Sequence, residues 1–91
     1  MEYSFYHIPE KCRFECQISG HLAFVEYNLQ RHLVTITKTF VPQELEGRGI
    51  ASELIQKVAE FCYENGYDIK ATCSYAVSWL RKHPTIIANQ Q

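Results

Sequence analysis

The first half of the chain alternates hydrophobic and polar residues, as half-buried β-strands do. The alternation is clearest in residues 13–19, where Phe14, Cys16 and Ile18 share one side. Ser19-Gly20 then predicts a tight hairpin turn. The strands expected from this pattern span residues 13–19, 21–29 and 32–41, and hairpins join them into an antiparallel meander.

The second half begins after Pro42, where hydrophobic residues recur every three to four positions and predict a helix. Asn65-Gly66 supplies the left-handed stop that ends many helices. A fourth strand is expected over residues 67–73, followed by a shorter helix over residues 74–83 with Ser74 or Cys73 near its N-cap. The apolar stripe of the long helix consists of Ile50, Ala51, Leu54, Ile55, Val58, Phe61 and Cys62.

These elements predict one α+β domain over residues 1–91, in the order strand, strand, strand, helix, strand, helix. The strand–helix–strand unit requires a right-handed crossover, so the fourth strand should run parallel to the third in a mixed sheet. The tail, residues 85–91, is expected to fray.

Composition narrows the functional classes. The 91 residues carry a formal net charge of −1 with a pI near 6.4, which disfavours binding to a nucleic-acid backbone. No apolar run approaches the ~20 residues that span a bilayer, and the start lacks a secretion signal, so we expect a cytoplasmic protein. The four cysteines, Cys12, Cys16, Cys62 and Cys73, are then expected to be reduced, and no matching pair completes a zinc site.

The most informative segment is Glu46-Gly47-Arg48-Gly49-Ile50-Ala51-Ser52, between the third strand and the long helix. Glycines allow close backbone approach to a ligand, and the free N–H groups of the helix start attract phosphate oxygens. With Arg48 the segment suits a diphosphate, whereas a tight turn without a ligand is the alternative. The motifs GxxxxGK[ST] and GxGxxG are both absent, since the second needs glycine in place of Ser52.

This segment resembles the acetyl-CoA loop of GNAT acetyltransferases, [RQ]-x-x-G-x-[GA], which commonly follows a Val-Pro at a strand end. The wider chain is similar to the short, stand-alone GNAT-like proteins. Glu46 stands where many GNAT enzymes have Arg or Gln, and Lys38 stands where the short relatives often have His. The matching positions are Phe14, Gly20, Ala23, Tyr27, Thr39, Val41-Pro42, Gly47, Gly49, Ala51, Cys73, Tyr75 and His83-Pro84.

The resemblance implies a minimal acyl-CoA N-acyltransferase fold that uses acetyl-CoA to acetylate an amine, either a small amine or a protein lysine or N-terminus. It implies that a backbone N–H near Phe40 or Val41 polarises the thioester carbonyl and that Tyr75 protonates the leaving thiolate. It also implies that Cys73 lies near the acetyl group, where an acetyl-cysteine route is one possibility and a structural thiol is another. The residues implied to bind the cofactor are Phe40, Val41, Glu46, Gly47, Arg48, Gly49, Ile50, Ala51 and Ser52.

Two other classes of function stay open at this point. A CoA-binding module without turnover is suggested by Glu46, which places an acid beside the diphosphate, and by the lack of a clear general base. A partner- or RNA-binding domain would need the basic residues gathered into one patch. A monomer or weak dimer is expected, since a free sheet edge can pair two chains. The basic residues concerned are Arg48, Lys57, Lys70, Arg81 and Lys82.

Overall fold

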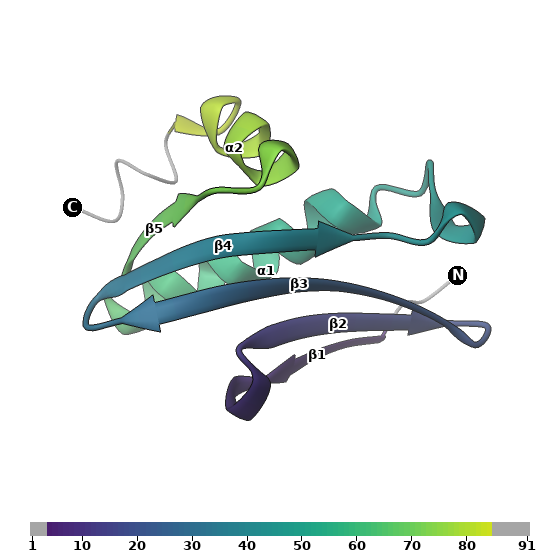
Figure 1. Cartoon of the computed structure of the whole chain (residues 1–91), viewed down its shortest axis with the longest axis horizontal. Helices are drawn as coiled ribbons and strands as arrows, with labels where there is room; N and C mark the ends of the chain where they lie inside the picture. Colours follow the sequence, from purple (N-terminus) through teal and green to yellow (C-terminus); the bar gives the residue numbers. More distant parts are fainter. Residues whose placement is uncertain (1–3, 85–91) are drawn as a thin grey trace.

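The computed structural model describes residues 4–84, which form a five-stranded sheet in the order β1-β2-β3-β4-β5. One long helix, α1, packs on one face of this sheet, and the short α2 follows β5 (Figure 1). The predicted α+β mixed sheet is confirmed, and the predicted tail lies outside the described residues. The elements are β1 (Ser4–Ile8), β2 (Arg13–Ile18), β3 (His21–Gln30), β4 (Leu33–Phe40), α1 (Ile50–Asn65), β5 (Asp68–Ala71) and α2 (Ser74–Arg81), with single 3₁₀ turns at Pro9–Lys11 and Gln43–Leu45.

The expected order of elements was wrong at the N-terminal end, where β1 adds an antiparallel edge strand beside β2. His7 of β1 pairs with the core residue Phe14 of β2. Because histidine is not a hydrophobic residue, it interrupts the alternation that predicts a strand. His7 is accommodated by its contacts: its ring stacks on Phe14 at 4.0 Å, and its Nε2 lies 2.7 Å from the hydroxyl of Tyr27. An aromatic cluster therefore holds this strand where aliphatic residues usually do.

The predicted meander is confirmed, since β2, β3 and β4 pair in antiparallel register. The β2–β3 turn places Ser19 and Gly20 at φ of 51° and 79°, the left-handed values that two-residue hairpins require. Between β3 and β4 the register shifts at Glu26, because β4 carries one extra residue there. Val25, Tyr27 and Ile36 of these strands are buried under α1.

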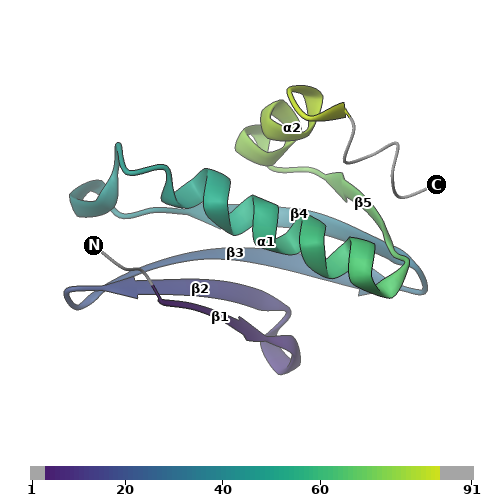
Figure 2. The ribbon, with the colours of Figure 1, turned by 180° about the vertical axis from the view of Figure 1, so that it is seen from behind.

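Helix α1 supplies the other half of the core, and its predicted apolar stripe is largely buried. In Figure 2, which views the molecule from behind, α1 lies in front of the sheet. The helix ends as predicted: Gly66 adopts a left-handed φ of 71°, and the N–H of Tyr67 donates to the Cys62 carbonyl at 2.8 Å. Leu54, Ile55 and Val58 are fully buried between α1 and the strands. No helix within residues 4–84 is long and apolar enough to cross a bilayer.

The pairing between β4 and β5 ends halfway along β4, and the divergence of the two strands beyond that point positions the candidate site. They pair in parallel, as predicted, from Leu33↔Asp68 to Ile36↔Ala71, and the N–H of Thr72 makes a further bond to the Ile36 carbonyl at 2.9 Å. The chain then enters α2, whereas β4 continues to Phe40. The β5-facing edge of β4 beyond Ile36 is thus left without a strand partner among the described residues.

His7 makes the stability of the fold depend on pH. Burial lowers the pKa of His7 below its usual 6.5, partly offset by the charge of Glu10. As pH falls below about 6.5 the unfolded chain takes up a proton that the folded chain resists, so stability declines until the lowered pKa is passed. We expect urea unfolding at pH 8 and pH 5 to show a smaller loss of stability in His7→Gln than in the wild type. Equal losses in the two proteins would contradict this reading of the cluster.

Candidate active site

A pocket of about 320 Å³ opens where β4 and β5 diverge. Its walls come from the end of β4, the loop that follows, the first turn of α1 and the start of α2, so segments distant in sequence meet there. The residues that line it are Thr39, Val41, Leu45, Glu46, Gly47, Gly49, Ile50, Ala51 and Tyr75.

The loop before α1 is held at one buried point and is otherwise exposed. The side chain of Leu45, at the end of the 3₁₀ turn, is 1% exposed and fixes the loop to the core. Gly47 and Gly49 then adopt left-handed φ values of 82° and 75°, which other L-residues adopt only with strain. No atom lies within 4 Å of a Cβ built on either glycine, so the space above the backbone is open to a ligand.

The start of α1 offers backbone donors to this pocket. The backbone N–H of Glu53 donates the first helical hydrogen bond, to the Gly49 carbonyl at 3.0 Å. The N–H groups of residues 50–52 precede it and have no acceptor within the helix. Gly49 is the N-cap and has no side chain to occupy these donors. The combination of free N–H groups and the positive end of the helix dipole suits an anion such as a phosphate.

The predicted cofactor residues divide into two groups. Val41, Glu46, Gly47, Gly49, Ile50 and Ala51 line the pocket, whereas Phe40, Arg48 and Ser52 do not. The ring of Phe40 lies 5.4 Å from that of Phe24, its cross-strand neighbour on the sheet face away from α1. The hydroxyl of Ser52 accepts a hydrogen bond from Trp79 Nε1 at 2.7 Å, which ties α1 to α2. Arg48 is exposed between the two loop glycines.

Of the two predicted catalytic residues, Tyr75 lines the pocket, whereas Cys73 does not line it and contacts the lining residue Thr39. Cys73 is the N-cap of α2, and its Sγ lies 3.3 Å from the hydroxyl of Thr39 on β4. Tyr75, in the first turn of α2, lines the pocket and remains 44% exposed, so its hydroxyl is available to a ligand. Cys73 is half-buried and packs against the core, which is compatible with both a structural thiol and a reactive one.

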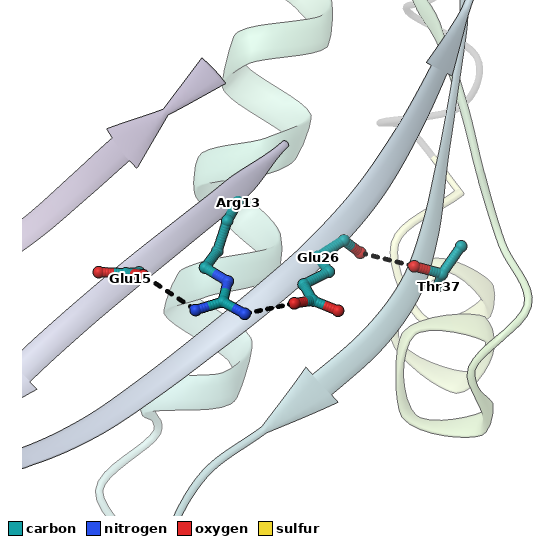
Figure 3. Close-up of polar contacts among 4 residues, drawn as sticks. All are labelled: Arg13, Glu15, Glu26 and Thr37. Carbon is teal, nitrogen blue, oxygen red and sulfur yellow. Dashed lines mark hydrogen bonds and ion pairs between the residues drawn. The ribbon is translucent and has the colours of Figure 1, made fainter. Parts of the chain in front are cut away.

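From the sequence, no chemical role was predicted for Thr39. Thr39 nevertheless lines the pocket, and its hydroxyl contacts the Sγ atom of Cys73. The reason is the bulge. Strict alternation after Ile36 would turn Lys38 towards α1, but the extra residue Thr37 shifts the pattern and brings Thr39 into register with buried Val25. The Thr37 hydroxyl donates to the Glu26 carbonyl at 3.3 Å, across the bulge (Figure 3). Neither a bulge nor its position follows from a count of hydrophobic residues.

Two further thiols, one acid and one histidine make contacts away from the pocket lining. Burial raises the pKa of Cys16 above its usual value and that of Cys62 to about 12, so both stay protonated within the core at neutral pH. Glu26 forms an ion pair with Arg13 on the face of the sheet opposite α1, away from the pocket (Figure 3). The His83 ring stacks on Trp79 at 3.8 Å, and its Nδ1 lies 2.7 Å from the Trp79 carbonyl, which makes it part of the α2 end.

A second hollow, of about 620 Å³, lies at the other end of β4, beside the β3–β4 hairpin. Gln30, Arg31, His32, Leu33 and Asp68 border it. It contains no glycine and no helix start, so it lacks the backbone donors that distinguish the pocket at α1.

Comparison with known proteins bears on the family and the fold of the chain. A family model described as GCN5-related N-acetyl-transferase matches residues 13–89. The NMR solution structure of a GCN5-like protein from Staphylococcus aureus superposes with a TM-score of 0.73 and 27% identity, covering 91% of this chain and 82% of that one. No curated protein matches the chain significantly.

Proposed function

The chain belongs to the GCN5-related N-acetyltransferase family, and from that premise we propose that it transfers an acetyl group from acetyl-CoA to an amine. The family supports acyl transfer in general. The observation that supports this cofactor is the pocket itself, where the glycine loop and the start of α1 lie at one side and Tyr75 lies at the other. Cys73 lies just behind this side, in contact with Thr39 of the pocket lining. A long thioester needs such a site, with a phosphate cradle at one end and reactive groups at the other.

The loop would hold the pyrophosphate of the cofactor. Its donors are the free N–H groups at the start of α1, approached closely over Gly47 and Gly49, which present no Cβ. Arg48 carries the positive charge of this segment but does not line the pocket, whereas Glu46 does line it and would repel the phosphates. Each helix-dipole contact contributes only about 0.3–1 kcal/mol, so affinity depends on several N–H bonds acting together with the rest of the ligand.

The pantetheine arm would follow the free edge of β4. Beyond Ile36 this edge has no strand partner among the described residues, so an extended chain of amides can pair with its backbone. Such a path leads from the glycine loop past Val41 to Thr39, where the thioester would meet the α2 side of the pocket. The mainly apolar lining there, including Ile50 and Ala51, suits the uncharged arm.

The proposed reaction is direct transfer. The nitrogen of a neutral amine attacks the thioester carbonyl carbon, the C–S bond breaks, and the CoA thiolate takes a proton from the hydroxyl of Tyr75. A backbone N–H near Phe40 or Val41 would stabilise the oxyanion of the tetrahedral intermediate. The tyrosinate is reprotonated as the acetylated amine loses its extra proton through solvent. The position of Cys73, 3.3 Å from Thr39, keeps the acetyl-cysteine route as a second path.

Cofactor binding is tested by calorimetry with acetyl-CoA. Ala51 lines the pocket from a regular helical position, so Ala51→Trp fills the pocket without the backbone strain that a substitution at left-handed Gly49 would add. We expect Ala51→Trp to weaken binding at least tenfold, a loss of about 1.4 kcal/mol or more. The matched control is Gln56→Trp, on an exposed position of α1, which should bind as the wild type does. A wild type that fails to bind at millimolar acetyl-CoA would contradict the proposal.

Turnover is tested with a panel of amines by following thioester consumption. Removing the hydroxyl in Tyr75→Phe should lower kcat by roughly 10²-fold or more, the usual contribution of a general acid, while leaving acetyl-CoA binding intact. Tyr63→Phe is the control, since Tyr63 is 66% exposed on α1 and does not line the pocket. Intact-mass spectrometry of enzyme and acetyl-CoA without acceptor shows whether Cys73 becomes acetylated. Binding with no turnover on any amine would indicate the alternative, a CoA-binding module.

A further inference from the structure

The face of the sheet opposite α1 is uncovered by any described helix or loop across β1 to β4 (Figures 1 and 2). The strand registers place its side chains in two adjacent rows that run across the four strands. In strand order from β1 to β4, the first row is Tyr6, Glu15, Phe24 and Phe40, and the second is Ile8, Arg13, Glu26 and Lys38. We call this surface the open face.

The charges on the open face are balanced and already organised. The Arg13 guanidinium bridges Glu15 and Glu26, as Figure 3 shows, and lies 4.2 Å from the centre of the Phe24 ring. Two acids and two bases, Arg13 and Lys38, sum to zero within the two rows. Any partner that this surface recognises by charge must therefore itself present both signs.

The charged residues of the open face are also partly buried within the single chain. Glu15 is only 8% exposed although no described element covers the face, and the Nε atom of Arg13 is buried with no hydrogen-bond partner among the described residues. Part of the desolvation that normally opposes burying charges at an interface has thus been met within the monomer, whereas the Glu26 side chain is 34% exposed and Lys38 is exposed. At the two outer strands the exposed aromatics Tyr6 and Phe40, 50% and 44% exposed, offer apolar area.

We propose that the open face binds a second copy of this chain, about a two-fold axis parallel to the strands and midway between β2 and β3. Such an axis exchanges β2 with β3 and β1 with β4 while keeping each row opposite itself. Arg13 then faces Glu26 of the second copy, and Glu26 faces the second copy's Arg13, so the two intramolecular pairs join in one alternating cluster. Tyr6 of each copy faces Phe40 of the other, which closes the interface with aromatic contacts on both sides.

Self-complementarity favours this occupant over an unrelated protein. Under the same symmetry no acid meets an acid and no base meets a base: Glu15 faces Phe24, and Ile8 faces Lys38. Face-to-face packing of two sheets with aligned strands is a common arrangement. With strands ~4.8 Å apart and alternate residues ~6.8 Å apart, two rows over four strands cover roughly 260 Å² per copy. This is about a third of the ~800 Å² that each partner contributes to a standard interface, so the dimer should be weak.

Sedimentation equilibrium between about 10 μM and about 1 mM tests the association, since this range reports weak dissociation constants. The wild type should show a monomer–dimer equilibrium. Tyr6→Ser, which removes an exposed contact, should raise the dissociation constant at least tenfold. Tyr63→Ser removes an even more exposed tyrosine from α1, on the other side of the sheet, and should leave the dissociation constant unchanged. Wild-type protein that stays monomeric at 1 mM, or a dimer insensitive to Tyr6→Ser, would overturn the proposal.

A second measurement on the unmodified chain guards against a variant that misfolds. In a mixture of isotope-labelled and unlabelled protein at high concentration, filtered NOE spectra should show contacts between the Tyr6 ring of one copy and the Phe40 ring of the other. Contacts confined to the β1 edge or to α1 would overturn the proposed face. Neither measurement requires acetyl-CoA or an acceptor, so the outcome is independent of the proposed acetyl transfer.

Discussion

The structure depends on one feature of strand pairing: β5 leaves β4 after Ile36, and β4 continues to Phe40 paired with β3 alone. Had the parallel pairing continued to Phe40, the space at the start of α1 would be filled by strand and α2 would begin elsewhere. Instead the two helix starts lie on either side of an unpaired strand edge, which places backbone donors, Thr39 and Tyr75 around one pocket. Trp79 secures the arrangement, because its indole N–H donates to Ser52 and holds α2 to the first turns of α1.

The sheet also divides the molecule by chemistry. One face is closed by α1 and contains the core, including the buried thiols Cys16 and Cys62. The other face has two ordered rows of mainly aromatic and charged residues, and no described element covers it from β1 to β4. A chain of 91 residues has few elements with which to cover both faces of a five-stranded sheet, and the described elements leave this face open. Phe40 belongs to the open face, whereas its neighbours Thr39 and Val41 line the pocket, so the two surfaces meet along the end of β4.

Most of the fold was predictable from local patterns. Three features follow from the burial or turn preference of single residues. They are the alternation around Phe14 and Cys16, the hydrophobic stripe of α1, and the end of that helix at Gly66. The glycine loop was predictable for the same reason, since left-handed backbone at Gly47 and Gly49 favours glycine.

The missing parts are those that depend on distant residues. Strand β1 was missed because half-buried His7 is held by contacts with Phe14 and Tyr27 and not by its own hydrophobicity. The bulge in β4 depends on its pairing with β3, and it decides that Thr39 faces the pocket. Ser52 looked like a phosphate ligand from its place in the loop, and its bond to Trp79 is visible only once α2 is placed.

The most direct test of the account is a titration of the isotope-labelled chain with acetyl-CoA, followed by amide chemical shifts. The account predicts that the largest changes fall on the residues around the pocket, namely Thr39, Val41, Gly47, Gly49, Ala51 and Tyr75, with little change around the hollow at Gln30 and Asp68. Changes centred on that hollow, or none at millimolar acetyl-CoA, would contradict the claim that the divergence of β4 and β5 builds a cofactor site.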